Sequence, residues 1–466
     1  MKEAGHISTH KSSFRDPAGF LFTENGRLLR QINPVYREEY DFLLNSGLYE
    51  NLVGRKLLVS HREINDHPGY SHPFYKIIEP EPIGFISYPF ELSFSQLKDA
   101  ALTTLIIQKI ALEHGMTLKD SSAYNIQFKN GAPVLIDTLS FEIYREGNPW
   151  TAYRQFCQHF LAPLALMRWK DIRLNQLLKC YIDGIPLDLA SRLLPVKTRL
   201  KFSLLWHIHL HAGAQKKYRN KGALAGQVRI KKINLIALIG SLITIVSKQA
   251  HEKQTTEWED YYSFTNYPAR AFAHKKELVA RFLQNTVTRI LWDLGANTGE
   301  FTQIAGQSGI DCIAFDIDQG AIESFYNRIK REKITNILPL VMDLTNPTPS
   351  IGWNNDERFS FVQRPHPDTI LALAWIHHMA ISNTLPLIKI AGFLSELCQN
   401  LIIEFVPKTD SQVMKLLESR RDIFPGYNEE NFEHEFSSFF TIIAKEQIRD
   451  SQRILYLMKN RNHVPA

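Results

Sequence analysis

The chain has 466 residues, of which 44% are hydrophobic and 22% are charged. These fractions are those of ordinary folded proteins and exclude a disordered, collagen-like or low-complexity chain. The 54 Lys and Arg residues against 48 Asp and Glu residues give a net charge of +6, which permits an anionic partner without requiring one.

The length corresponds to two large domains or three smaller ones. The four cysteines are far apart in the sequence and form no C-x-x-C pair, so neither a disulfide framework nor a zinc knuckle is indicated. Residues 1–15 are polar and lack the apolar core of a signal peptide. We therefore expect a cytoplasmic protein.

The most informative motif of the N-terminal half is D-S-S-A-Y-N, from Asp120 to Asn125. These two residues have the D-x-x-x-x-N spacing of a kinase catalytic loop, and Asp137 follows an apolar run twelve residues later. The arrangement resembles the C-lobe of protein-kinase-like folds. The resemblance implies an α+β domain in which Asp120 orients an acceptor hydroxyl while Asn125 and Asp137 hold magnesium on ATP.

Several residues depart from the kinase pattern. Leu118-Lys119 replaces His-Arg before the aspartate, Thr-Leu follows Asp137 instead of Phe-Gly, and no glycine-rich phosphate loop is visible. Arg27 or Arg30 would have to replace the strand lysine. Two alternatives stay open: a pseudokinase-like substrate or regulatory domain, and an accessory domain whose Asp and Asn make turn hydrogen bonds.

Three alternate histidines, His207, His209 and His211, would share one face of a strand and could bind a metal. The surrounding pattern is helical and apolar, however. We therefore expect structural histidines here.

The middle of the chain predicts a linker. Basic residues gather over 216–232 with no aromatic residue beyond Tyr218, which favours a solvated segment and gives no support to a nucleic-acid partner. The apolar run 233–246 is shorter than the roughly 20 residues of a membrane-spanning helix, so we expect no membrane span. The predicted parts are a kinase-like or accessory domain (1–215), a basic linker with a junction helix (216–254), and a C-terminal domain (255–466).

The C-terminal half alternates short apolar strands with amphipathic helices. A helix is expected between the second and third strands because Ile322, Phe325, Tyr326 and Ile329 recur at helical spacing. The alternation is typical of an α/β fold with a mostly parallel sheet that a final antiparallel hairpin completes. The strands are expected at 289–292, 312–315, 337–341, 369–375, 401–406, 440–444 and 454–458.

Ligands of open parallel sheets bind outside the carboxyl ends of the strands. The first strand runs into Asp293-Leu-Gly-Ala-Asn-Thr-Gly. Gly295 can turn tightly and let the backbone approach a ligand, Asn297 tolerates a left-handed conformation, and Gly299 begins the next helix.

The next two strands also end in acids. Asp316 lies 23 positions after Asp293, where a carboxylate can accept hydrogen bonds from ribose hydroxyls. Asp343 ends the third strand and could accept an adenine amino group, while Met342 packs on the ring. The G-x-G-x-x-G dinucleotide fingerprint is absent, and Asp293 would repel a pyrophosphate but favour a cofactor with an ammonium and a sulfonium group.

This ordered set resembles class I S-adenosylmethionine-dependent methyltransferases over about residues 256–460. The resemblance implies a Rossmann-like, seven-stranded methyltransferase sheet. The alternative is that these acids are ordinary strand-end turn residues. The implied S-adenosylmethionine site consists of Asp293, Gly295, Asn297, Gly299, Asp316, Met342 and Asp343.

The fourth strand leads into Ala374-Trp-Ile-His-His-Met. In the methyltransferases that it resembles, this strand end faces the transferred methyl group. His377 or His378 could act as a general base on a hydroxyl or amine, since the ordinary histidine pKa lies near 6.5. The alternative is that one histidine caps a helix and the other packs.

The whole chain resembles bacterial two-part methyltransferases, including those grouped with nodulation host-specificity proteins. The stretches that match are FRDPAGFLF, DSSAYNIQF, IDTLSFE, DLGANTGEF, ALAWIHHMAIS and EFVPK. The function expected is methyl transfer to an O or N nucleophile of an unidentified small-molecule or protein substrate. The alternatives are a phosphotransferase or pseudokinase-like protein with a regulatory, cofactor-binding C-terminal half, and a cofactor-binding scaffold without turnover.

Overall fold

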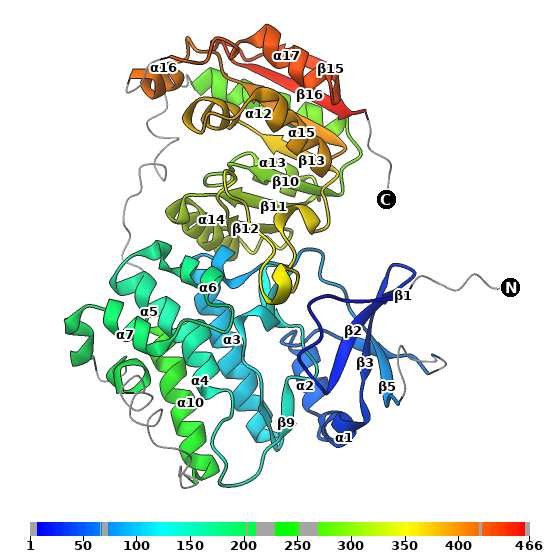
Figure 1. Ribbon diagram of the computed structural model, residues 1–466, viewed down its shortest axis with the longest axis vertical. Helices are drawn as coiled ribbons and strands as arrows, with labels where there is room; N and C mark the ends of the chain where they lie inside the picture. The colour runs from blue at the N-terminus through cyan, green and yellow to red at the C-terminus, as the bar shows by residue number, and fades with distance from the viewer. Residues whose placement is uncertain are drawn as a thin grey trace, which may run out of the picture. The chain divides into compact units, whose positions relative to one another are not determined.

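The computed structural model describes residues 7–65, 67, 73–201, 204–210, 229–250, 269–418 and 422–461 (Figure 1). Their contacts divide the chain into two compact units. Unit 1 comprises Met1–Glu252 together with Ser350–Phe359, and unit 2 comprises Lys253–Pro349 together with Ser360–Ala466.

Unit 1 begins with an antiparallel sheet of five strands in the order β1-β2-β3-β5-β4. The turn between β2 and β3 is Asn25-Gly26, and both residues have positive φ, as the tightest hairpins require. Helices α1 (Arg37–Asn45) and α2 (Leu48–Gly54) follow β3. The strands are β1 (Ile7–Thr9), β2 (Gly19–Glu24), β3 (Arg27–Ile32), β4 (His61–Glu63) and β5 (Lys76–Pro80).

The rest of unit 1 is built around α3 (Phe94–Glu113). A capping box of Ser93 and Gln96 begins this helix, and most of its side chains are buried. Two short strand pairs follow, β6 with β9 and β7 with β8. The remaining strands and α-helices of unit 1 are β6 (Met116–Leu118), β7 (Ile126–Lys129), β8 (Ala132–Leu135), β9 (Phe141–Ile143), α4 (Tyr153–Phe156), α5 (Ala162–Trp169), α6 (Leu177–Cys180), α7 (Leu187–Leu193) and α10 (Lys232–Ser247).

The ten residues Ser350–Phe359, which we call the strap, separate two parts of unit 2 in the sequence but pack in unit 1. The Arg15 guanidinium donates two hydrogen bonds to the Glu357 carboxylate, at 2.9 and 2.8 Å. The Tyr88 hydroxyl donates to the main-chain oxygen of Phe359 at 3.0 Å. The strap is therefore attached to the rest of unit 1 through a side chain, that of Glu357, and through a main-chain oxygen, that of Phe359.

The sequence predicts a separate linker and junction helix over 216–254, and only residues 229–250 of that range are described. In these residues, α10 packs along α3 as part of unit 1. Leu235, Ile239, Leu242 and Val246 form its buried face. None of the helices in the described ranges is long and apolar enough to span a membrane.

Unit 2 contains one seven-stranded sheet in the order β12-β11-β10-β13-β14-β16-β15 (Figure 1). The first five strands of this order are parallel, and β16 and β15 continue the sheet antiparallel. The strands are β10 (Ile290–Leu294), β11 (Asp311–Asp316), β12 (Ile337–Val341), β13 (Thr369–Ala372), β14 (Asn400–Phe405), β15 (Phe440–Gln447) and β16 (Ile454–Asn460).

An α-helix lies between most successive strands of unit 2, but only 3₁₀ helices separate β12 from β13, and β15 leads directly into β16. Helix α12 packs on α13, and α15 packs on α17. Strands β10, β13 and β14 lie in the interior of the sheet and are almost fully buried. The helices are α12 (Ala269–Gln284), α13 (Thr302–Gln307), α14 (Gln319–Glu332), α15 (Leu387–Leu397), α16 (Ser411–Glu418) and α17 (Glu429–Ser437).

All seven strand positions expected from the sequence carry a strand, and the differences lie at the ends. The clearest difference is at the fourth, which is expected to run to Trp375 but ends at Ala372. Ala374 has a φ of +50°, which is incompatible with an extended strand. The chain therefore leaves the sheet before the two predicted histidines.

Candidate functional site

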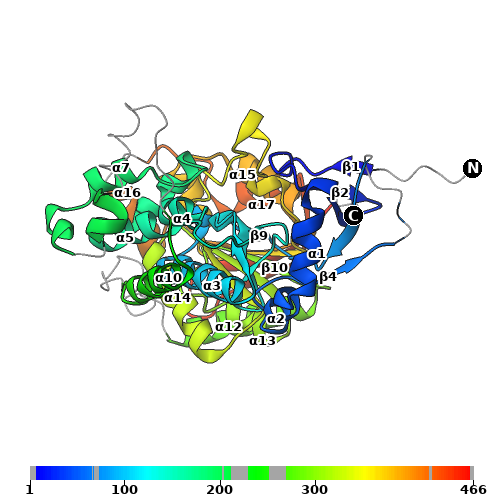
Figure 2. The same ribbon diagram turned by 90° about the horizontal axis from the view of Figure 1, so that it is seen from below.

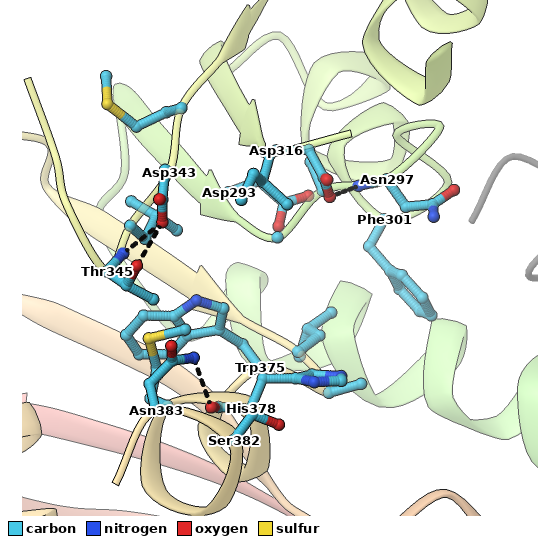
Figure 3. A pocket seen from close by; sticks show the side chains of 18 of the residues that line it. Asp293, Asn297, Phe301, Asp316, Asp343, Thr345, Trp375, His378, Ser382 and Asn383 are labelled. Carbon is cyan, nitrogen blue, oxygen red and sulfur yellow. Dashed lines mark hydrogen bonds between the residues drawn. The ribbon is translucent and has the colours of Figure 1, made fainter. Parts of the chain in front are cut away.

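The three predicted acids of unit 2 lie at the carboxyl ends of neighbouring strands. Asp293 is near the end of β10, Asp316 ends β11, and Asp343 comes two residues after β12. Because β10, β11 and β12 are adjacent and parallel, these side chains meet at one edge of the sheet. Figure 3 shows Asp293 next to Asp316, with Asp343 to the left of both.

The hydrogen bonds of these acids are mostly local. The Thr302 hydroxyl donates to Asp293 Oδ2 at 2.6 Å. The backbone N–H of Asn297 donates to Asp316 Oδ2 at 2.7 Å. Asp343 Oδ1 accepts from the backbone N–H and the hydroxyl of Thr345, at 2.9 and 2.6 Å. These contacts fix the orientation of all three carboxyl groups.

Burial raises the pKa values of both Asp293 and Asp316 above those of ordinary carboxyl groups. Burial, together with the neighbouring charge of Asp316, brings the pKa of Asp293 to about 7, against the lowering effect of the hydrogen bond from Thr302. Burial also raises the pKa of Asp316 to about 6, against the backbone hydrogen bonds that it accepts. A bound cation would draw both groups toward their ionised forms, so the pair is suited to a positively charged ligand.

The glycine turn between β10 and α13 explains three of the predicted residues. Gly295 and Gly299 both have a φ of +80°, and Asn297 has a φ of +50°. A Cβ on Gly299 would lie 2.0 Å from Phe325 Cζ. Gly299 is not among the described residues that line the cavity at this edge of the sheet. Packing against α14 therefore requires Gly299 to be a glycine, whereas Gly295 and Asn297 line the cavity.

A cavity of about 450 Å³ opens at this edge of the sheet, within the size range of small-molecule sites. Figure 3 shows the three acids on one side of the cavity and Trp375, His378, Ser382 and Asn383 on the other. The lining residues used below are Phe272, Lys275, Asp293, Gly295, Asn297, Phe301, Asp316, Met342, Asp343, Trp375, His378, Ser382, Asn383 and Arg453.

The two predicted histidines have different positions. His378 lines the cavity, whereas His377 is buried behind it and is not among the described lining residues. Burial, with a contribution from Arg453, lowers the pKa of His378 to about 4, and burial lowers that of His377 well below its usual value. Both imidazoles are therefore neutral at pH 7, and His378 is the one that can contact a ligand.

A buried ionic cluster lies at the same end of the cavity. The Lys275 ammonium donates to Glu404 Oε2 at 2.6 Å, and Arg453 lies 3.5 Å from Glu404 Oε1 and 2.7 Å from Asp410 Oδ2. Burial lowers the pKa of Lys275. Burial alone would raise the pKa of Glu404, but the charges of Lys275 and Arg453 outweigh it and lower that pKa. The cluster balances two cations with two acids.

Sequence reasoning missed Lys275 and Arg453. Lys275 carries a signal, because it is a charged residue within the apolar stripe of Ala271, Leu278 and Phe282 on α12. Arg453 follows the turn between β15 and β16 and has no such signal. Its role depends on contacts with distant parts of the chain.

The three predicted kinase-like residues also come together, in unit 1. Asn125 donates its amide N–H to Asp120 Oδ2 at 3.0 Å. Burial, and then the charge of Asp137, raise the pKa of Asp120. Arg30 lies 2.5 Å from Asp137 Oδ1, and Arg27 pairs with Glu79 instead. Of the two arginines considered for the strand lysine, Arg30 is thus the one at this cluster.

These contacts do not fit a magnesium site. Asp137 is bound by Arg30 and accepts hydrogen bonds from the Leu139 N–H and the Ser140 hydroxyl, at 2.9 Å each. Burial would raise the pKa of Asp137, but Arg30 and these hydrogen bonds outweigh it and lower that pKa. Across the described part of the chain, no three His, Cys, Asp or Glu side chains form a group that could hold a metal ion. The arrangement therefore gives ATP–magnesium binding no support.

The histidines of the middle region are structural in the described residues. The segment is a π-helix, η7 (Leu205–Leu210), and not a strand. His207 Nδ1 shares a hydrogen bond with the Tyr153 hydroxyl at 2.6 Å, and His209 is hydrogen-bonded to Ser191 and Thr198. His211 lies outside the described residues.

The chain is similar to one curated protein over nearly its whole length. It is 34% identical over 454 residues to "Nodulation protein NoeA" of Rhizobium meliloti (strain 1021), and the match covers 95% of this chain and 94% of that protein. No protein-family model matches the chain.

Solved structures match parts of the chain at low identity. The N-methyltransferase NodS of Bradyrhizobium japonicum WM9 is 12% identical, with a TM-score of 0.32, over 41% of this chain and 97% of that one. The magnesium protoporphyrin IX methyltransferase of Synechocystis PCC 6803 is 17% identical, with a TM-score of 0.30, over 41% and 84%. The bifunctional kinase-methyltransferase WbdD is 13% identical, with a TM-score of 0.30, over 48% and 46%.

Proposed function

The chain belongs to the family of the nodulation protein NoeA, a name that specifies no reaction, and from the site in unit 2 we propose that it is an S-adenosylmethionine-dependent methyltransferase acting on an O or N nucleophile. The observation that carries the proposal is the cavity that joins three strand-end acids to a wall with an aromatic ring and a neutral histidine. The strand order of unit 2 also supports a class I methyltransferase sheet, because it places the three acids after three adjacent parallel strands.

The residues present fit this cofactor. The buried pair Asp293 and Asp316 matches its positive charges and ribose hydroxyls, and Met342 and Asp343 are suited to an adenine ring. Gly295 lines the cavity without a side chain, and a Cβ there would lie 3.2 Å from Trp375 Cδ1. Gly299 supports the turn without contacting the cavity.

When bound, the cofactor supplies a methyl group on a sulfonium, a reactive group that the protein has only to orient and keep from water. The acceptor would lie between the acidic wall and Trp375, with Phe272 and Phe301 excluding solvent. His378 is neutral at pH 7, so an imidazole nitrogen can accept a hydrogen bond from the O–H or N–H of the acceptor and orient its lone pair. His377 would act only by supporting His378, whose ring centroid is 4.1 Å away.

For unit 1 we propose a kinase-like fold without phosphotransfer. The antiparallel sheet, the long helix α3 and the strand pairs that bring Asp120, Asn125 and Asp137 together support this fold. The ion pair between Arg30 and Asp137 argues against metal binding at the same carboxylate. Unit 1 would then serve in substrate binding or regulation.

The test is calorimetric titration of the full chain with S-adenosylmethionine. We expect a Kd in the micromolar range, about −8 kcal/mol, and a loss of at least tenfold in affinity in Asp293→Asn and in Asp316→Asn. Asp311→Asn is the matched control, because Asp311 is exposed and begins the strand β11 that Asp316 ends. Its affinity should equal that of the unchanged chain.

No heat of binding by the folded chain, or an equal loss in Asp311→Asn, would contradict the proposed cofactor site. Binding without transfer of a labelled methyl group to any component of a cell extract would favour the cofactor-binding scaffold over the enzyme. A transferred label lost in His378→Gln, with cofactor affinity unchanged, would assign that side chain to the acceptor.

A further inference from the structure

Positive charge is concentrated in one part of the sequence. The 63 residues from 189 to 251 contain twelve of the 54 Lys and Arg residues and none of the 48 Asp and Glu residues. The remaining chain, with 42 basic and 48 acidic residues, carries a net charge of −6. The net charge of +6 is therefore the sum of one strongly basic stretch and a remaining chain that is acidic.

The described part of this stretch also exposes large apolar side chains. Leu200 is 87% exposed, Val196 76%, Trp206 52% and Leu210 44%. They belong to a 3₁₀ helix, η6 (Val196–Leu200), and to η7. Scattered single apolar residues are common on protein surfaces, but four within fifteen residues of sequence call for a reason.

Cations alternate with these apolar residues. Lys197, Arg199 and Lys201 are all exposed and lie next to Val196 and Leu200 in the sequence. We call the seven residues Val196, Lys197, Arg199, Leu200, Lys201, Trp206 and Leu210 the basic–apolar patch.

Partly buried hydrogen bonds hold the segment in this orientation. His209 contacts the Ser191 hydroxyl of α7 at 2.7 Å and the Thr198 hydroxyl of η6 at 3.0 Å. His207 is bound to Tyr153. Since His207 and Ile208 are buried, Trp206 and Leu210 necessarily point outward on the opposite face of η7. The exposure of these side chains is a property of the folded structure.

A second basic and apolar group follows in the same acid-free stretch. Lys231 is exposed and Ile233 is 72% exposed at the beginning of α10, where the Glu146 carboxylate accepts a hydrogen bond from the backbone N–H of Lys232. Helices α7 and α10 lie on the side of unit 1 opposite its five-stranded sheet in both views (Figures 1 and 2).

We propose that the basic–apolar patch docks unit 1 on the surface of a bilayer that contains anionic lipids. Lys and Arg next to such a surface attract its headgroups, while Trp, Leu and Val side chains insert at the boundary between headgroups and acyl chains. A nucleic acid is the other large polyanion, but surfaces that bind single strands carry several aromatic side chains on which the bases stack. This patch has only one aromatic residue, Trp206. Docking of this kind needs no membrane-spanning helix.

The experiment is co-sedimentation of the full chain with vesicles of phosphatidylcholine alone and of phosphatidylcholine mixed with phosphatidylglycerol. We expect binding to the mixed vesicles only, weakened at high salt. The triple variant Lys197→Gln, Arg199→Gln, Lys201→Gln and the double variant Val196→Ser, Leu200→Ser should each bind about tenfold more weakly or worse. All five positions are exposed, so thermal unfolding should be unchanged.

Matched controls carry equivalent substitutions elsewhere on the surface. The charge control is Lys330→Gln, Arg331→Gln, Lys459→Gln, and the apolar control is Val287→Ser, Ile443→Ser, all at exposed positions of unit 2. Both should bind the mixed vesicles as the unchanged chain does.

Equal losses in the controls, no binding to the mixed vesicles, or a loss confined to the charge variant would each overturn the proposal. Binding to a DNA or RNA fragment in place of the vesicles would overturn it in favour of a nucleic-acid surface. None of these results depends on methyl transfer.

Discussion

At the scale of single residues, the same side-chain type serves different purposes at neighbouring positions. Gly295 lines the cavity, whereas Gly299 is required by the ring of Phe325. The sequence could predict both glycines as parts of one turn, because the spacing shows where the backbone must bend. It could not separate them, because the position of Phe325 depends on how α14 packs.

Gly299→Ala should destabilise the protein more than Gly309→Ala. Both glycines have nearly the same φ, +80° and +79°, but a Cβ at Gly309 meets no atom within 4 Å. Backbone strain alone should cost about 1 kcal/mol in Gly309→Ala, and the added clash should bring Gly299→Ala to about 3 kcal/mol. Urea denaturation of the two variants measures the difference, and equal values would contradict the packing explanation.

The ionisation of Asp293 predicts a pH dependence of cofactor binding. Because burial raises its pKa to about 7, this group loses its proton as the pH rises through about 7, and its carboxylate then attracts a cation. Affinity for S-adenosylmethionine should therefore increase between about pH 6 and pH 8. Calorimetric titrations across this pH range at constant ionic strength measure the change in affinity.

The stability of the free protein should change in the opposite direction. A carboxyl group whose pKa is raised by folding contributes a stability that is fully present below its ordinary pKa of 3.8 and is lost progressively from there until the pH has risen through about 7. Asp293→Asn should reduce both slopes, the rise in affinity and the fall in the free energy of unfolding. Slopes unchanged in that variant would show that another group titrates.

At the scale of secondary-structure elements, the sequence predicts the strands of unit 2 and misses the strap. The strands could be predicted because short apolar runs end in acids and glycines, which are local signals. The strap has no such signal, since the ion pair between Arg15 and Glu357 joins residues 342 positions apart. The same limit applies to Arg453, which meets Glu404 only in the folded sheet.

The strap contains a matched pair of acids for testing its attachment to unit 1. Glu357 is buried and makes two hydrogen bonds with Arg15, whereas Asp356 is partly exposed and pairs with the exposed Lys11. Glu357→Gln should lower the free energy of unfolding by about 1–2 kcal/mol, and Asp356→Asn by less than about 0.5 kcal/mol. Urea denaturation gives both values.

Amide hydrogen exchange locates the effect. In Glu357→Gln, exchange should accelerate in the strap and in residues 10–18 between β1 and β2, which contain Arg15. In Asp356→Asn it should stay close to that of the unchanged protein. The same acceleration in both variants would mean that the buried carboxylate contributes no more than the exposed one.

At the scale of the whole molecule, two parts are predictable from composition, but their boundaries are not. The change from an aromatic-rich half to alternating strands and helices indicates two folded regions. Residues 216–254 are expected to form a basic linker with a junction helix, yet α10, which lies in the described part of this range, packs along α3 within unit 1. Local patterns could not predict this, since the apolar face of α10 packs on a helix more than a hundred residues earlier in the chain.

The strap also sets the order in which the chain can be completed during synthesis. Unit 1 contains Met1–Glu252 but also Ser350–Phe359, so about 100 residues of unit 2 are translated before unit 1 has all of its parts. At about 5–20 residues per second, this interval lasts on the order of 5 to 20 seconds. Throughout it, Arg15 and Tyr88 are without the strap atoms that bind them, and the nascent first unit presents to the cell a surface that the finished protein covers.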